Sequence, residues 1–261
     1  ERKKFRYSKE YFRYIILEYL QRYTFKNANG IIFLSDYSIN KINIKNTSAE
    51  IKTIYHGVDR SFFNTNRENR DFKNDYSNPI KLLYVSIINY YKNQINVVKA
   101  FEDLVNKGYK IDLTLVGPAY NPALKELEKY ISGLDGIKNN LSYIGNVEHE
   151  LLIDYYNNAD IFLLQLNDIP AFKKVLPSKI FEYGSFDKPM LAGVQGVANT
   201  FIKENLPDAY LFDPGDVNSV VKYIDSIIEN GFPLINNDVF IEKYSRNNIM
   251  NDMLNSIVSS H

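Results

Sequence analysis

The sequence predicts an α/β fold built on a parallel, doubly wound sheet, because two patterns alternate along the chain. Short apolar runs, typical of strands covered on both faces, alternate with segments of helical period. Such repeated alternation is characteristic of a parallel sheet with helices on both sides. The strand-like runs span residues 31–35, 51–56, 80–86, 111–117, 141–145, 160–166, 189–193 and 209–213. The helical segments lie near residues 36–46, 92–108, 121–134, 148–158, 178–186, 196–204, 216–231 and 239–259.

A polar, Asn-rich stretch at residues 64–79 separates the first two strand-like runs from the other six and is typical of a linker. We therefore expect residues 80–235 to form one complete domain with about six strands. Residues 1–63 are then the remnant of another domain, and residues 236–261 form a final helix that packs back toward it. Because the chain begins at Glu1 inside a charged segment, we expect a further segment upstream.

Composition excludes several classes of protein. Lys plus Arg and Asp plus Glu both number 31 in 261 residues, so no net charge attracts nucleic acid. The sequence contains no Cys, which removes disulfides and thiolate metal sites and suits the cytoplasm. No apolar run approaches the roughly 18 residues of a membrane span, and no signal peptide begins the chain. We expect a cytoplasmic globular protein.

The first 26 residues combine eight Lys or Arg and three Glu with many aromatic side chains. A basic, aromatic, amphipathic helix of this kind can lie on an anionic membrane surface. It can equally be a surface helix that packs Phe12, Ile16, Tyr19 and Tyr23 onto its own domain. Both interpretations stay open at this point, and the first implies peripheral contact with the inner face of the cell membrane.

The stretch PSKIFEYGSFDKPMLAG, residues 177–193, predicts an anion site. Ser178 is a good N-cap after Pro177, so we expect a helix from Lys179 whose free N–H groups face a loop at the carboxyl edge of the sheet. Phosphate suits such an end. Glu182, about 6 Å further along the same face, could accept hydrogen bonds from ribose hydroxyls. The alternative is that Glu182 is only a favourable acid in a first helical turn.

Lys92 supplies a second indication of an anion. We expect it to open the helix after strand 80–86, where a cation opposes the helix dipole unless an anion lies nearby. The alternative is a solvated surface Lys. The loop between them, residues 86–91, lacks glycine, so the G-x-G-x-x-G fingerprint of dinucleotide oxidoreductases is absent there and a dehydrogenase loses support.

The motifs KLLYVSIINYYKNQ, LTLVGP, LSYIGNV, YYNNADIFLL and VLPSKIFEYGSFDKPMLAG follow one another in an order that resembles family four glycosyltransferases. The resemblance covers nearly the whole chain and implies the GT-B fold, in which two Rossmann-like domains face each other. It implies that this chain contains the complete donor-nucleotide domain and the tail end of a truncated acceptor domain. Among members, it is similar to bacterial enzymes that build surface polysaccharides such as O-antigen or capsule.

The resemblance also implies roles for individual residues. Lys92 matches the Lys that neutralises the diphosphate, and Glu182 matches the second Glu of the Glu-x7-Glu motif, which binds ribose. The loop at the phosphates matches Pro177, Ser178 and Lys179, and the main chain that faces the base matches Asn146 and Val147.

Two departures from the family pattern concern charge. Lys174 stands where the family has the first Glu, which touches the donor sugar. Ser86 and Ile87 stand where it has a Gly and a phosphate-binding Arg. Two consequences stay open: the donor sugar is an unusual one, or Lys174 and Lys179 take over part of the charge neutralisation.

The implied function is transfer of a sugar from a nucleoside-diphosphate donor, such as a UDP-sugar, to a glycan or lipid-linked acceptor, with a retaining mechanism. We expect no cofactor and no metal, since the sequence has no Asp-x-Asp and its three His are scattered. Two alternatives stay open: a sugar-nucleotide epimerase, and a donor-binding half without activity, either a truncated chain or one subunit of a split transferase. The sequence leaves donor sugar, base, acceptor and oligomeric state undetermined.

Overall fold

The computed structural model describes residues 9–41, 48–59, 62, 78–89, 92, 94–134 and 136–258. The chain divides into two compact units, the larger formed by residues 58–245 and the smaller by residues 1–57 with 246–261. The predicted linker, 64–79, lies outside the described residues except for its last two. The domain limits expected from the sequence stay predictions.

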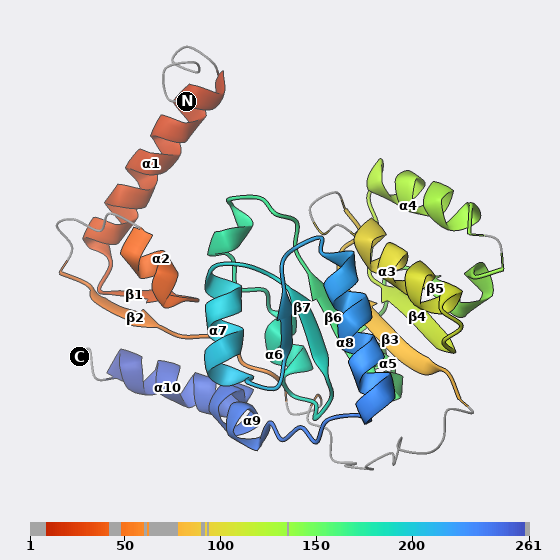
Figure 1. The fold of residues 1–261 in the computed structure, drawn as a ribbon. Helices are drawn as coiled ribbons and strands as arrows, with labels where there is room; N and C mark the ends of the chain where they lie inside the picture. The colour runs from red at the N-terminus through yellow and green to blue at the C-terminus, as the bar shows by residue number, and fades with distance from the viewer. Residues whose placement is uncertain are drawn as a thin grey trace. The chain divides into compact units, whose positions relative to one another are not determined.

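The larger unit is built on a six-stranded parallel sheet with the order β5-β4-β3-β6-β7-β8 (Figure 1). The pairing registers are parallel throughout, for example Leu82 opposite Leu113 and Phe162 opposite Met190. The strands are β3 (Ile80–Val85), β4 (Ile111–Val116), β5 (Leu141–Ile144), β6 (Ile161–Gln165), β7 (Met190–Gly193) and β8 (Tyr210–Phe212). The expected parallel sheet of about six strands is therefore confirmed.

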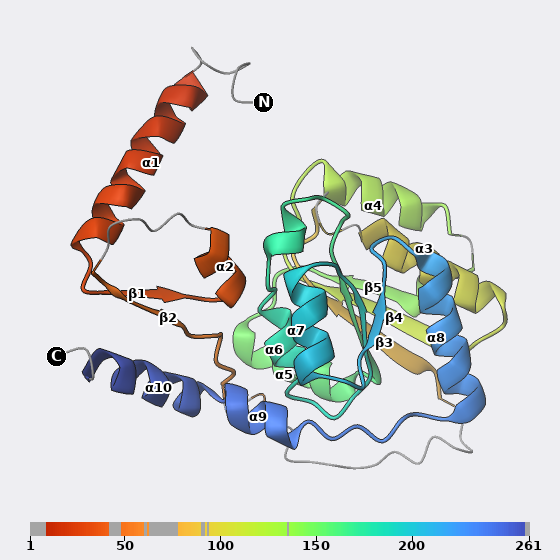
Figure 2. The same ribbon diagram turned by 60° about the vertical axis from the view of Figure 1, so that its left-hand side comes forward.

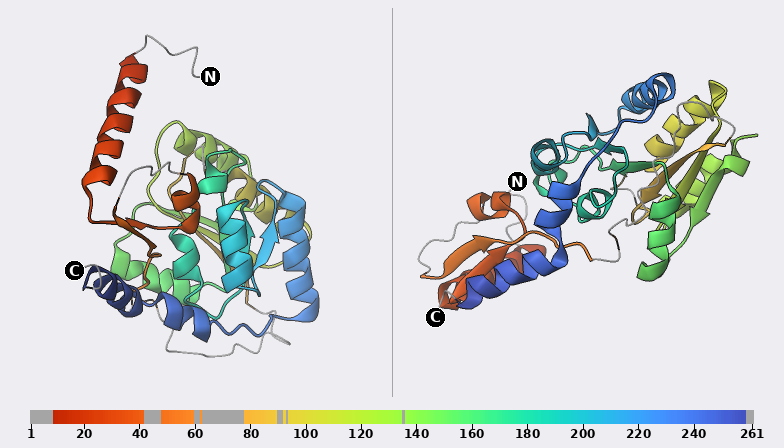
Figure 3. Two further views of the ribbon diagram at one scale, coloured as in Figure 1. Left: turned by 90° about the vertical axis from the view of Figure 1, so that its left-hand side faces the viewer. Right: turned by 90° about the horizontal axis from the view of Figure 1, so that it is seen from below.

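One face of this sheet is covered by three helices whose apolar side chains form a continuous core (Figures 1 and 3). These helices are α3 (Gln94–Asn106), α4 (Ala123–Ser132) and α8 (Val217–Asn230). Phe101 and Leu104 of α3 and Ile224 of α8 are fully buried there against strand residues such as Leu113. The alternate residues of each strand that point to this face supply the other half of the core.

The opposite face is covered by α5 (His149–Asn158), α6 (Lys179–Tyr183) and α7 (Val197–Asn205) (Figure 3). Its core is aromatic. The Phe162 and Tyr183 rings stack with centroids 4.7 Å apart, and Phe181 packs edge-on against Tyr244, 5.2 Å away. Aromatic pairs in these arrangements contribute packing energy beyond the area that they bury. This aromatic layer lies directly beneath the helix that begins at Lys179.

The carboxyl-terminal part contains two helices where one was predicted. α9 (Asp238–Tyr244) belongs to the larger unit and α10 (Arg246–Val258) to the smaller. Ser245 separates them with an extended conformation, φ −61° and ψ 141°. The N–H of Val58 donates to the carbonyl of Tyr244 at 2.9 Å, so α9 ends where residue 58 pairs with the chain. Helical periodicity continues across Ser245, and no Gly or Pro marks the break.

The smaller unit contains α1 (Lys9–Asn27), β1 (Gly30–Phe33), α2 (Asp36–Lys41) and β2 (Glu50–Thr53), with the two strands parallel. Figure 2 shows α1 as a straight helix that extends away from the strands of this unit. No residue of α1 is buried, and its exposed apolar side chains include the four consecutive residues Tyr14–Leu17. Four consecutive residues span a full turn, so the expected amphipathic character of this helix is wrong. None of the helices described is long and apolar enough to cross a membrane.

Candidate functional site

The site predicted from the sequence lies at the topological switch point of the sheet, between β3 and β6, where the strand order reverses. β4 and then β5 lie on one side of β3. β7 and then β8 follow β6 in the opposite direction across the sheet. β3 and β6 are neighbours, with Leu82 opposite Ile161. In doubly wound sheets, ligands bind outside the carboxyl ends of the two strands at such a switch point. The loops that follow β3 and β6 carry Lys92 and residues 174–179, respectively.

Lys92 lies two residues before α3 and does not open that helix, which begins at Gln94. Its main chain is fixed by Tyr84, whose hydroxyl group donates to the Lys92 carbonyl at 3.3 Å. The Gln94 amide holds the same loop by donating to the carbonyl of Ile87 at 2.7 Å. Ile87 itself is 41% exposed and brings no charge to the place where the family has an Arg.

The ammonium group of Lys92 is partly buried, and within the described part of the chain no opposite charge compensates it. Its Nζ lies 5.9 Å from the centroid of the Phe172 ring, and the described residues supply it with no carboxylate. Burial lowers the pKa of Lys92 below its ordinary value of 10.5, because it removes the charged form from water. A partly buried cation at a sheet's switch point is a candidate for binding an anion.

Phe172 begins a short 3-10 helix, η4 (Phe172–Lys174), that the sequence did not predict. The contact between Phe172 and the ammonium group of Lys92 brings the segment that carries Lys174 next to Lys92. Lys174 is exposed, whereas Lys173 forms an ion pair with Asp168 at 3.3 Å. The structure thus places the 3-10 helix that carries Lys174, through Phe172, beside the ammonium group of Lys92.

Helix α6 begins at Lys179, as predicted, but it is five residues long and Ser178 does not cap it with its side chain. Ser178 already has helical dihedral angles, φ −60° and ψ −27°. An N-cap side chain needs extended angles to reach back to the first N–H groups, so the predicted cap is wrong. Pro177 is buried and its carbonyl accepts from the N–H of Ile180 at 3.2 Å. Because so short a helix has little dipole, charge in this loop comes from its lysines.

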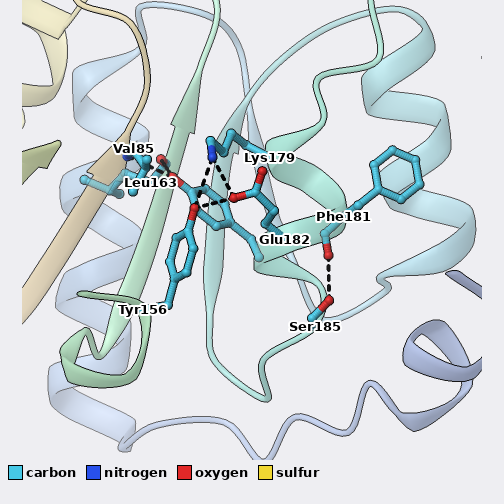
Figure 4. A network of polar contacts seen from close by, with 8 residues as sticks. Val85, Tyr156, Leu163, Lys179, Phe181, Glu182 and Ser185 are labelled. Atoms are coloured by element: carbon cyan, nitrogen blue, oxygen red, sulfur yellow. Dashed lines mark hydrogen bonds and ion pairs between the residues drawn. The ribbon is translucent and has the colours of Figure 1, made fainter. Parts of the chain in front are cut away.

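Glu182 is engaged by two neighbours within the protein (Figure 4). The ammonium group of Lys179 donates to Oε2 of Glu182 at 2.6 Å, and the hydroxyl group of Tyr156 donates to the same oxygen at 2.5 Å. The two side chains of the ion pair are 24% and 17% exposed. Oε1 has no hydrogen-bond partner among the described residues. The sequence predicts an open carboxylate at Glu182, whereas in the structure one of its two oxygens already accepts two hydrogen bonds.

Tyr156 was not predicted as part of the site. It is fully buried on α5, and burial together with the negative charge of Glu182 raises the pKa of its hydroxyl group, so the group is a hydrogen-bond donor at physiological pH. Nothing in the local sequence distinguishes Tyr156 from the other buried aromatic residues. The Lys179–Glu182 spacing of three residues, in contrast, does predict an ion pair on one helical face.

Asn146 and Val147 follow β5, two strands away from β3, and no contact described here joins them to the lysines. They line a hollow of about 580 Å³ together with side chains of α5, including Asp154 and Tyr155. None of the other predicted residues lines it. A second hollow, about 230 Å³, lies near the amino ends of β3 to β5 and contains no predicted residue.

Comparison with known proteins identifies the family of this chain. Residues 65–247 match the family model described as "Glycosyl transferases group 1". The chain is 26% identical to Protein CapJ of Staphylococcus aureus over 242 residues, which cover 92% of this chain and 54% of that protein. It is 28% identical over 141 residues to an uncharacterised glycosyltransferase of Methanocaldococcus jannaschii, which corresponds to 53% of this chain and 35% of that protein.

Among solved structures, the crystal structure of Anabaena HepE in complex with UDP and glucose has a TM-score of 0.72. It is 19% identical, and the match covers 91% of this chain and 65% of HepE. The chain therefore spans about half the length of CapJ and about two thirds of HepE.

The sheet order and the loops at its switch point define a Rossmann-like domain of the GT-B type. The chain belongs to the glycosyl transferases group 1 family, which confirms the resemblance stated from the sequence. Membership in a family of transferases does not favour the epimerase alternative.

Proposed function

We propose that the protein transfers a sugar from a nucleoside-diphosphate sugar to a glycan or lipid-linked acceptor. The observation that carries the proposal is the position of Lys92, a partly buried cation without a carboxylate among the described residues, at the switch point of the sheet. Family membership supports the reaction class. HepE, a structural neighbour, was crystallised with UDP and glucose, which supports UDP as the first nucleotide to test.

In the proposed reaction the leaving group is a nucleoside diphosphate, whose terminal phosphate gains negative charge as the bond to the sugar breaks. A cation that meets this charge in the transition state accelerates the step. We assign this role to Lys92. Lys179 and Lys174, which follow β6, would neutralise the remaining charge of the diphosphate.

The other predicted residues would hold the rest of the nucleotide. Glu182 would accept hydrogen bonds from the ribose hydroxyl groups, and the main chain at Asn146 and Val147 would face the base. The hollow that these two residues line offers room for a base. Pro177 and Ser178 shape the loop that leads into α6, so they would set the position of Lys179 at the phosphates.

We further propose that the reaction retains the anomeric configuration and needs no metal. No group of three or more His, Asp and Glu side chains in the described part of the chain could hold a metal ion. Transfer that continues at full rate in excess EDTA supports metal independence. A rate that is lost in EDTA and restored only by Mg²⁺ or Mn²⁺ contradicts it. Retention is tested by proton NMR, which compares the anomeric configuration of the new glycosidic bond with that of the sugar in the donor.

Nucleotide binding tests the assignment of Lys92. Calorimetry measures the affinity of the chain for UDP and GDP, and of the variants Lys92→Ala and Lys99→Ala. Lys99 is an exposed lysine on α3 and serves as the matched control. A charge-assisted contact contributes about 1.5–3 kcal/mol, so Lys92→Ala should weaken binding roughly 10- to 100-fold, whereas Lys99→Ala leaves it unchanged. Equal affinity of the Lys92 variant contradicts the assignment.

A turnover assay separates the transferase from its alternatives. Release of nucleoside diphosphate from a sugar nucleotide that depends on an added acceptor supports a transferase. Conversion of the sugar nucleotide into its epimer, with no nucleotide released, supports an epimerase. Tight nucleotide binding with no turnover of any donor supports the donor-binding half.

A further inference from the structure

The side chain of Tyr156 is held rigidly in the aromatic layer beneath α6. It has no exposed surface. Four rings surround it with centroids 5.4 to 5.8 Å away, namely Phe62, Phe162, Tyr183 and Phe186. Its main chain is fixed as well, because the ammonium group of Lys188 donates to the carbonyls of Tyr156, Asn157 and Ala159 at the end of α5. The hydroxyl group of Tyr156 therefore occupies one position.

One oxygen of Glu182 consequently accepts from two donors that differ in mobility, a buried ring and a partly exposed Lys side chain. Tyr156 donates to Oε2 from a fixed ring. Lys179 donates to the same atom from a long, flexible side chain that is 24% exposed, and it also donates to the Tyr156 hydroxyl group at 3.2 Å. A Lys side chain can turn toward another anion by rotation about its own bonds, whereas the buried ring cannot move without displacing its neighbours. Figure 4 shows the three polar groups converging from α5 and α6.

We propose that Tyr156 is a positioning residue for Glu182 in nucleotide recognition. When a diphosphate draws Lys179 away, the hydrogen bond from Tyr156 keeps Oε2 in place. Oε1, which has no partner among the described residues, then points to the ribose hydroxyl groups. The inference rests on the proposed function, since it assigns the ribose subsite of the same donor site.

Recognition of the ribose then depends on the hydroxyl group of Tyr156, which does not itself contact the ribose. A carboxylate distinguishes a ribose 2′-hydroxyl group from the hydrogen of 2′-deoxyribose only when the orientation of its accepting oxygen is fixed. A freely rotating carboxylate forms hydrogen bonds with water instead. Loss of the Tyr156 hydroxyl group should therefore reduce discrimination between ribose and 2′-deoxyribose. A purely structural role would weaken the binding of both nucleotides to the same degree.

The experiment compares UDP with 2′-deoxy-UDP, and GDP with 2′-deoxy-GDP, by calorimetry on the 261-residue chain, on Tyr156→Phe and on Tyr130→Phe. Tyr130 is a matched control, because its hydroxyl group also donates to a carboxylate, Glu102, at 2.6 Å, but between α4 and α3. We expect the unmodified chain and Tyr130→Phe to bind the ribonucleotide about 10-fold more tightly than its deoxy analogue. In Tyr156→Phe this ratio should fall to about 2 or less.

A second variant keeps the proposal testable if Tyr156→Phe does not fold. Lys179→Met leaves the Tyr156–Glu182 hydrogen bond in place, so it should weaken UDP binding yet keep the 10-fold ratio. A ratio lost in Lys179→Met, or retained in Tyr156→Phe while the unmodified chain discriminates, overturns the role of Tyr156 and leaves the proposed function standing. If the unmodified chain binds none of the four nucleotides, the proposed function and this inference both fall.

Discussion

Among single residues, Lys92 carries a charge that no described residue compensates, and this makes stability depend on pH. Burial lowers its pKa in the folded chain below 10.5. Between the folded pKa and 10.5 the unfolded chain therefore binds more protons at this position, so the contribution of Lys92 to the free energy of unfolding rises as pH increases through that window. Below the window the buried charge destabilises the fold.

Lys92→Met should accordingly be more stable than the unmodified chain at pH 7, and the difference should shrink as pH approaches 10.5. Urea unfolding of both proteins from pH 7 to 10.5 measures this, with Lys99→Met as the exposed control that shows no such trend. A difference that is constant with pH, or one that grows, contradicts the burial of an uncompensated ammonium group.

The candidate residues also show what local sequence can and cannot predict about a site. Lys92 could be singled out because a cation at the expected start of a helix opposes the helix dipole, and Glu182 because it lies one turn after Ser178 on the same predicted helical face. The cap expected from Ser178 failed because capping depends on dihedral angles that the residue type does not determine. Tyr156 could not be found, since its role depends on α5 and α6 meeting across the aromatic layer.

Among elements, the strands were the easiest to predict. Each of the eight predicted runs overlaps a strand, with ends that differ by no more than a few residues. Continuous burial on both faces makes such runs apolar throughout, and this signal is local. The 3-10 helix η4 and the break at Ser245 were missed, because both depend on contacts with distant segments, Gly196 in the first case and Val58 in the second.

The close approach of α7 to η4 predicts a cost for adding a side chain at Gly196. Gly196 has a φ of +65°, and a Cβ there would lie 2.1 Å from the carbonyl oxygen of Lys173. Gly108 is a matched control, since its φ is +89° but a Cβ would meet nothing within 4 Å. Gly108→Ala should cost about 1–2 kcal/mol from backbone strain alone. Gly196→Ala should cost clearly more and also weaken UDP binding, because η4 must shift away from Lys92.

Urea unfolding gives the stability of both glycine variants, and calorimetry gives their affinity for UDP. Equal losses of stability in Gly196→Ala and Gly108→Ala would mean that η4 moves away from the new Cβ without a loss of free energy of unfolding. Unchanged UDP affinity in Gly196→Ala would mean that the position of η4 is irrelevant to the nucleotide.

For the chain as a whole, the division into two units predicts that residues 58–245 fold by themselves. This unit contains the complete six-stranded sheet, both of its covering layers and every candidate site residue. Its two ends are joined, because Val58 pairs with Ser245 and bonds to the Tyr244 carbonyl. The fragment should unfold in one cooperative transition and bind UDP within about threefold of the affinity of the full chain.

A shorter fragment, residues 80–235, follows the boundary predicted from the sequence and lacks α9. It should be less stable than 58–245, because it loses Phe240 and Tyr244, which are buried against Phe181 and Phe201. Removing large buried aromatic side chains typically costs about 3–5 kcal/mol each, so the shorter fragment should melt at a much lower temperature or fail to fold. Thermal unfolding of the two fragments beside the full chain decides the matter. Equal melting temperatures would place the true boundary near residue 235, as the sequence suggested, and would make α9 an appendage of the sheet domain.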